Sequence, residues 1–332
     1  MNQKVKRIGS LVLAVCMILT MLPLTVSAET GSMASGTMEI GGETGISLAS
    51  DNSGTGWAWN ASTATLTLDS YYNGGYIEID CDENDTINLI YNGDVSLNVS
   101  GPYAPDAINC EGNLIISVGD GGGTLTITHN SQDFTNVLDT GGTLTFHSGT
   151  VIVNEFGIDY AVYASGDVTI RAEASVDITN RNNYGLNSSG SLYLYGSLTA
   201  AGGSSSNAVD LSSVYVNGGR LTTTGAAIGY SGNVNADVVV SSGEVNICGN
   251  LDGGLTVIDG TVNISGTVLY SINVIGGDVT VGGQEVDILL NPTLILDASE
   301  TGANPFRLAA LTGPVAEDVS GYTWNEAEKE LT

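Results

Sequence analysis

The chain has 332 residues, of which 36 are acidic, 8 are basic and 45 are glycine, and its formal net charge is −28. A surface of that charge repels nucleic acid and anionic lipid, so we expect no nucleic-acid partner. The two histidines and four cysteines lie at spacings that fit neither a zinc site nor a disulfide-rich scaffold.

The N-terminus has the pattern of a secretion signal. The basic residues Lys4, Lys6 and Arg7 precede a long apolar run, which ends at the small residues Val26-Ser27-Ala28. A proline inside the run disfavours the alternative of a retained membrane anchor. We therefore predict a signal peptide over residues 1–28, and its removal leaves 5 basic and 36 acidic residues, a net charge of −31. We expect an extracellular or cell-surface protein with no membrane insertion after this cleavage.

A linker and a cap are predicted next. Residues 29–37 are rich in glycine, serine, threonine and alanine, which is typical of a linker. Residues 38–70 contain the stretch GWAWNASTATLT at 56–67. Its tryptophans, Trp57 and Trp59, are suited to covering the exposed end of a repetitive core, so we interpret 38–70 as an N-terminal cap.

Short alternating apolar segments recur after the cap. Alternation with a period of two indicates β-strands, and the glycine, asparagine, aspartate and serine between the segments indicate turns. The segments form three series that advance together at steps of about 17–30 residues. The first series starts at Leu114, Leu144, Val168, Leu192, Val214 and Val238. The second starts at Leu125, Val151, Val176, Leu198, Leu221, Val245, Val262 and Val279, and a weaker third contains Ile79, Ile108, Leu138, Val162 and Leu186.

Three strands per repeat predict an all-β fold, a single-stranded parallel β-helix over residues 71–298. In such a solenoid each strand lies on its predecessor at about 4.8 Å. A sandwich of antiparallel hairpins is the alternative, but it does not require the same strand type to return at a fixed period. The tail, 299–332, contains GYTWNEAEKELT at 321–332, which repeats the 56–67 stretch in register. We interpret the tail as the start of a second copy of the cap motif.

The cap motif followed by a repeat rich in glycine, threonine and valine resembles a clostridial carbohydrate-binding family of parallel β-helix domains. The resemblance covers most of the mature chain. It implies a right-handed helix related in shape to pectate lyases, a cell-surface location, binding of cellulose-like and acidic plant polysaccharides, and bound calcium. No short functional motif of the family matches here, so the resemblance assigns no site residue.

A candidate ligand site follows from the strand alignment. Residues between the inward positions point to solvent, which places Tyr193, Tyr195 and Tyr215 on one sheet face. The same alignment puts Arg171 and His147 one and two coils from Tyr195, and Asn217 beside them. Aromatic rings stack on the apolar faces of sugars, and arginine and asparagine donate hydrogen bonds to hydroxyl or carboxylate groups. The alternative is a side-chain ladder that only stabilises the sheet.

A candidate calcium site lies in the turn DCDENDT, because carboxylates are the hard oxygen ligands that Ca²⁺ prefers. The predicted ligands are Asp80, Asp82, Glu83 and Asp85, with Glu111 placed next to Asp82 by aligning IDCD with INCE. The alternative is a solvated acidic turn. The same alignment stacks Cys81 on Cys110, which we expect to be buried thiols rather than a disulfide.

Together these features favour a non-catalytic, monomeric polysaccharide-binding module in which Ca²⁺ assists by bridging carboxylates. One alternative is a stalk or adhesin repeat of a larger surface protein, which the repeated cap motif favours. Another is a polysaccharide lyase or hydrolase, which would need a placed set of catalytic groups. No such set is visible in the sequence, so we predict no enzyme activity.

Overall fold

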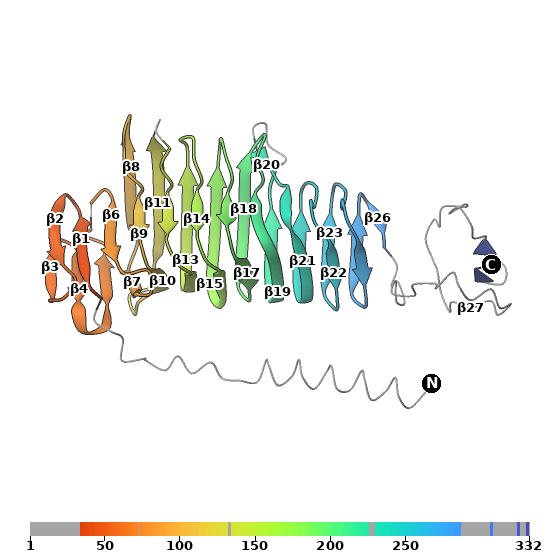
Figure 1. Ribbon diagram of the computed structural model, residues 1–332, viewed down its shortest axis with the longest axis horizontal. Helices are drawn as coiled ribbons and strands as arrows, with labels where there is room; N and C mark the ends of the chain where they lie inside the picture. The colour runs from red at the N-terminus through yellow and green to blue at the C-terminus, as the bar shows by residue number, and fades with distance from the viewer. Residues whose placement is uncertain are drawn as a thin grey trace, which may run out of the picture. The chain divides into compact units, whose positions relative to one another are not determined.

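The computed structural model describes residues 34–286, except 73, 132–133 and 226–229, and the backbone of three short segments at 306–307, 324–325 and 330–331. The predicted signal peptide and most of the tail lie outside the described residues. The fold is all-β, as predicted: 26 strands join in one sheet system, and the described residues contain one short 3₁₀ turn, Ala61–Thr63, and no α-helix. Figure 1 shows the strands following one another in chain order.

The N-terminal strands pair mainly antiparallel. Strand β1 (Gly36–Ile40) lies between β2 (Glu43–Ser47) and β6 (Ile77–Cys81), while β4 (Trp57–Asn60) lies between β3 (Asn52–Gly54) and β5 (Thr65–Asp69). Trp57 and Trp59 are buried here, and the indole Nε1 of Trp59 donates to the carbonyl of Leu48 at 3.0 Å. Because β1 begins at Gly36, regular structure starts two residues before the predicted cap boundary.

From β5 onward, most strands pair in parallel, and the parallel pairings form three columns. The first column contains β5, β7 (Thr86–Asn92), β10 (Asn113–Val118), the start of β13 (Leu144–Glu155), the start of β15 (Val168–Asn180), β17 (Ser191–Leu194), the middle of β19 (Val209–Thr223), the middle of β21 (Val234–Ile247), β22 (Leu255–Val257) and β24 (Ile272–Val274).

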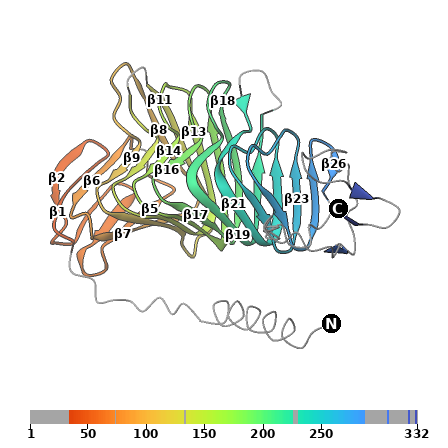
Figure 2. The ribbon, with the colours of Figure 1, turned by 45° about the vertical axis from the view of Figure 1, so that its right-hand side comes forward.

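The second and third columns have the same parallel order. The second contains β8 (Val95–Gly101), β11 (Thr124–Ser131), the ends of β13 and β15, β18 (Ser197–Gly203), the ends of β19 and β21, β23 (Thr261–Ile264) and β25 (Asp278–Val281). The third contains β6, β9 (Ile108–Cys110), β12 (Leu138–Thr140), β14 (Val162–Ala164), β16 (Leu186–Ser188) and the starts of β19 and β21. Figure 2 shows successive strands side by side.

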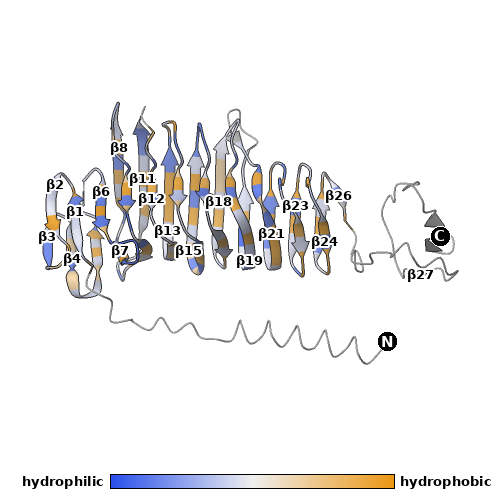
Figure 3. Ribbon diagram, in the orientation of Figure 1, coloured by the Kyte–Doolittle hydropathy of each residue, from blue (hydrophilic) through white to orange (hydrophobic). Residues whose placement is uncertain are grey.

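The first and second predicted strand series are confirmed residue by residue. Leu114, Leu144, Val168, Leu192, Val214 and Val238 pair in sequence along the first column. The second series pairs from Leu125 to Val279 in the same way. These side chains are buried, and hydrophobic and hydrophilic positions alternate along the strands in Figure 3. The core is therefore made of stacked inward-facing aliphatic residues.

The predicted register of the third series is wrong at its first step. Ile77, not Ile79, pairs with Ile108, and Ile79 pairs with Cys110. Both isoleucines point inward, because they are two residues apart in one strand. A shift by two residues keeps every side chain on its face, so the hydrophobic pattern does not distinguish the two registers.

A short pairing in the tail matches one in the cap. Strands β28 (Trp324–Asn325) and β29 (Glu330–Leu331) are antiparallel, with Trp324 opposite Leu331, and β27 (Phe306–Arg307) also pairs with β29. In the cap, Trp59 is opposite Leu66 with the same spacing. Two further short strands, β20 (Tyr230–Ser231) and β26 (Gln284–Glu285), pair antiparallel with β18 and β25.

Candidate functional site

Two tyrosines of the predicted site stack on each other. Tyr193 of β17 is opposite Thr169 on one side and Tyr215 on the other, which confirms the predicted outward column. The ring centroids of Tyr193 and Tyr215 are 5.2 Å apart and the ring planes differ by 12°. Partial burial and the nearby Asp167 raise the pKa of Tyr193, so the phenol is protonated at neutral pH. The two rings therefore stack across two neighbouring strands, and each ring covers one face of the other.

The second predicted column is less regular. Tyr195 follows β17, is 38% exposed and lies near Tyr193. Its backbone N–H donates to the carbonyl of Ile170, the residue before Arg171 in β15. A bulge between Phe146 and Ser148 takes His147 out of the ladder. Another shift pairs Asn217 with Ser242 instead of Ser241. The structure thus keeps the tyrosines together but breaks the regular column around them.

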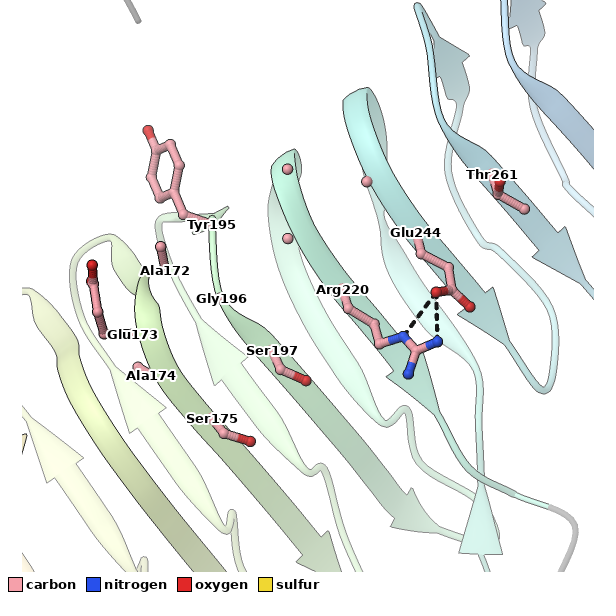
Figure 4. A pocket seen from close by; sticks show the side chains of 13 residues that line it. Ala172, Glu173, Ala174, Ser175, Tyr195, Gly196, Ser197, Arg220, Glu244 and Thr261 are labelled. Carbon is pink, nitrogen blue, oxygen red and sulfur yellow. Dashed lines mark hydrogen bonds and ion pairs between the residues drawn. The ribbon is translucent and has the colours of Figure 1, made fainter. Parts of the chain in front are cut away.

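An open groove with a volume of about 870 Å³ lies next to Tyr195 (Figure 4). Its residues come from successive strands at the corner between the first and second columns. One ladder of paired residues runs along it, namely Ser175, Ser197, Arg220, Glu244 and Thr261. At about 4.8 Å per strand, this ladder is about 19 Å long, so the groove crosses the strands instead of following them.

Glycine keeps the floor of this groove low. Gly243 has a φ of +106°, and a Cβ atom there would lie 2.2 Å from the carbonyl oxygen of Gly219. Both the left-handed backbone and the close approach exclude a side chain. The wall of the groove therefore consists of the side chains on either side of the glycines.

The ion pair of Arg220 with Glu244 was not predicted from the sequence. The Nε and Nη2 atoms of Arg220 donate to Glu244 Oε2 at 2.9 and 2.6 Å, and Figure 4 shows the arginine reaching toward the next strand. The amide of Asn246 and then Arg220 hold the pKa of Glu244 below its usual range. Both residues immediately precede second-series strands, LTT and VNI, and this shared position is the signal that could have revealed the pair.

The aromatic pair and the groove have complementary chemistry. Tyr193 and Tyr215 offer the uncovered parts of two stacked aromatic rings, whereas Arg220, Glu244 and the serines of the ladder offer hydrogen-bond donors and acceptors. Tyr195 connects the two regions, because it lines the groove and lies near Tyr193.

The acidic turn holds its carboxylates in local hydrogen bonds. Asp82 Oδ1 accepts from the backbone N–H and side-chain amide of Asn84 at 3.0 and 3.1 Å, and these bonds lower the pKa of Asp82. Asp85 Oδ2 accepts from the backbone N–H of Ser35 at 3.1 Å. Asp80 and Glu83 are exposed. No group of three histidine, cysteine, aspartate or glutamate side chains in the described residues has the spacing of a formed metal site.

The register places Glu111 differently from the prediction. The backbone N–H of Glu111 donates to the carbonyl of Ile79, and its carboxyl lies near Asp80 instead of Asp82. Cys81 and Cys110 are likewise offset in register, because Cys110 pairs with Ile79. Both cysteines are buried free thiols, as expected. The contact with Cys81 and burial together raise the pKa of Cys110, which keeps this thiol protonated.

A buried histidine–glutamate pair lies outside the groove. His129 Nδ1 is 2.8 Å from Glu155 Oε2, and both side chains are fully buried. His129 Nε2 is 3.0 Å from the carbonyl oxygen of Pro105. Since no part of either side chain reaches solvent, we interpret the pair as a structural link between β11 and β13, neighbouring strands of the second column in which the two residues are paired, and not as a site for substrate.

Comparisons of the chain with protein-family models, curated proteins and solved structures return no match. Within the described part of the chain, no helix has the length and apolar character needed to cross a bilayer.

Proposed function

We propose that this chain is a secreted or cell-surface, non-catalytic polysaccharide-binding module built on a right-handed parallel β-helix. Three columns of parallel strands, each returning in chain order, support this fold assignment. The secretion pattern of residues 1–28 and the acidic composition support the location.

The stacked pair of Tyr193 and Tyr215 is the observation that carries this function. Both rings are partly exposed, and aromatic groups on a rigid sheet lose little conformational entropy when a ligand binds. The groove beside Tyr195 extends the contact surface across several strands and adds the charged pair of Arg220 and Glu244. An extended glycan running across the strands could place sugar faces on the rings and hydroxyl groups along the ladder.

Calcium is the proposed auxiliary ion. Asp80, Glu83 and Glu111 are exposed carboxylates, and Asp82 and Asp85 lie in the same turn. Such oxygen ligands suit Ca²⁺, which would also reduce the repulsion between an acidic protein and an acidic glycan. Titration of the mature chain with CaCl₂, with and without polygalacturonate, tests this role. Equal glycan affinity in Ca²⁺ and in chelator would reject it.

The binding function is tested by removing the two stacked rings. The Tyr193→Ala/Tyr215→Ala double variant should lose binding to soluble cellulose-like or polygalacturonate chains by about tenfold or more, since each stacking contact contributes about 0.5–1.5 kcal/mol. A matched control is Tyr103→Ala/Tyr270→Ala, which removes two tyrosines that are 84% and 73% exposed elsewhere. An equal loss of glycan affinity in both double variants, or no loss in the Tyr193→Ala/Tyr215→Ala variant, would reject this site.

A structural stalk or adhesin repeat is the second candidate. The antiparallel pairing of Trp324–Asn325 with Glu330–Leu331 supports it, because the cap has the same pairing at the equivalent positions. This function requires further modules in the same reading frame. Sequencing the gene beyond the codon for Thr332 tests the requirement, and a stop codon there would reject the repeat array.

A further inference from the structure

A second aromatic cluster lies on the third strand column. Tyr160 precedes β14, Tyr163 lies within β14, and Tyr184 precedes β16. The ring of Tyr160 is 5.8 Å from that of Tyr163, with planes 22° apart, and 5.5 Å from that of Tyr184, with planes 45° apart. All three side chains are partly exposed. This cluster is separate from the Tyr193–Tyr215 pair, which lies on the first column.

Carboxylates surround these rings. The outward ladder of the third column runs from Asp139 to Tyr163, Asn187 and Asp210 on successive strands. Asp159 immediately precedes Tyr160 and accepts its backbone N–H at 3.0 Å. Asp159 and Asp210 are both close enough to raise the pKa of Tyr160, after burial as the first cause. Three aromatic rings and three carboxylates therefore share one surface.

Among the residues that the structure describes, no basic side chain forms an ion pair with these carboxylates. The ion pairs within the described residues are His129–Glu155 and Arg220–Glu244, and neither includes them. Arg181 is exposed in the turn before Tyr184, but it forms no ion pair with this cluster. Burial raises the pKa of Asp139, and the charge of Asp159 raises it further. The cluster thus carries uncompensated negative charge next to aromatic faces.

Amide side chains complete the surface. Asn136 Nδ2 donates to Asp139 at 2.7 Å, and Asn207 Nδ2 donates to Asp210 at 3.1 Å. Asn235 Nδ2 also donates to Asp210 at 3.0 Å, and together these bonds hold the carboxylates in place. Aromatic rings attract an organic ammonium group through their π faces, and carboxylates attract it by charge. A metal ion would use the oxygens alone, so the rings indicate an organic cation.

We propose that the Tyr160–Tyr163–Tyr184 cluster, with Asp139, Asp159 and Asp210, binds the ammonium groups of an amino-sugar glycan. Asn187, which is opposite Tyr163 on the next strand, offers an amide that can bond sugar hydroxyls beside the ring, so we assign a glycan and not a lysine-rich peptide. The charged amine provides selectivity: an N-acetylated sugar has the same ring but no positive charge. This binding is additional to the proposed site at Tyr193 and Tyr215.

The test measures binding of a glucosamine hexamer and an N-acetylglucosamine hexamer to the mature chain by calorimetry at 150 mM salt, where long-range attraction is screened. We expect the glucosamine hexamer to bind more tightly. The Tyr160→Leu variant has the same net charge as the wild type, and its affinity for the glucosamine hexamer should be roughly three- to thirtyfold weaker, the range expected for a cation–π contact. Tyr160→Phe keeps the ring and should restore affinity, and Asp210→Asn should reduce it.

Two controls separate this site from general attraction to an acidic protein. Asp120→Asn removes a charge from an exposed turn, and Tyr270→Leu removes an exposed ring outside both proposed sites, so both should bind the glucosamine hexamer normally. If Tyr160→Leu unfolds, as judged by circular dichroism, Tyr184→Leu replaces it. Equal binding of both hexamers, no binding, or no effect of the leucine variant would overturn the proposal. Oligolysine that binds as tightly, with the same dependence on Tyr160, would overturn the assignment to a glycan.

Discussion

Replacement of Asp106 should stabilise the protein in a pH-dependent way. Asp106 lies in the turn before β9, where its Oδ1 accepts the backbone N–H of Asn136 at 2.6 Å. Burial raises its pKa from 3.8 to about 6, and the charge of Asp139 adds to the rise. A carboxyl with a raised pKa favours folding while it is protonated. This contribution is fully present below pH 3.8 and is lost as the pH rises through about 6.

The Asp106→Asn variant removes the buried charge but keeps an oxygen that can accept the hydrogen bond from Asn136. A rise of about two pKa units corresponds to about 3 kcal/mol at pH 8. Because Asp106 keeps partial contact with water, which screens its charge, we expect a smaller gain of about 1–2 kcal/mol at pH 8. At pH 4.5 the wild-type carboxyl is protonated in the folded state, so the gain should fall below about 1 kcal/mol.

Urea unfolding followed by circular dichroism at pH 4.5, 6 and 8 measures this dependence. The control is Asp120→Asn, which makes the same change in charge at an exposed turn. A gain that is independent of pH, or a gain of the same size in the control, would refute the explanation by burial. Destabilisation at every pH would show that the carboxylate makes a contact that the amide does not replace.

Three other predictions concern the core, the glycine floor and catalysis. Phe146 is 1% exposed, and replacing it with alanine should lower the unfolding free energy by about 3–5 kcal/mol, because the change leaves a cavity. A urea unfolding midpoint within error of the wild-type value would contradict this prediction. Gly243→Ala should cost at least about 1–3 kcal/mol, since its backbone is left-handed and the added Cβ would meet the carbonyl oxygen of Gly219. Gly75→Ala, where a Cβ has open space, serves as its control in thermal melts. Incubation with polygalacturonate should generate no absorbance from unsaturated products, and a steady rise at any pH between 5 and 9 would instead establish lyase activity.

The sequence by itself determined which face each core residue occupies. Leu192 and Val214 alternate with polar neighbours and return at a regular interval, and both are fully buried. The same period placed Tyr193 opposite Tyr215, because outward residues between two aligned inward positions must also align. The position of this tyrosine pair could therefore be predicted from two features of the sequence: the alternation of inward and outward residues in each strand, and the length of the repeat.

Only the tertiary structure decided the features that depend on register and on turns. Ile77 and Ile79 both face inward, so the alternation of apolar and polar residues does not show which one pairs with Ile108. In the structure Ile77 pairs with Ile108, and β6 also pairs antiparallel with β1 on its other edge. The Tyr160–Tyr184 contact forms in the turns before β14 and β16, and the groove at Arg220 forms where the register of β19 with β21 shifts between Asn217 and Arg220. There the chain turns through irregular backbone, and side-chain direction no longer follows a period of two. The periodicity of the sequence specifies which way each side chain points within a strand, whereas contacts between turns depend on how the strands are stacked.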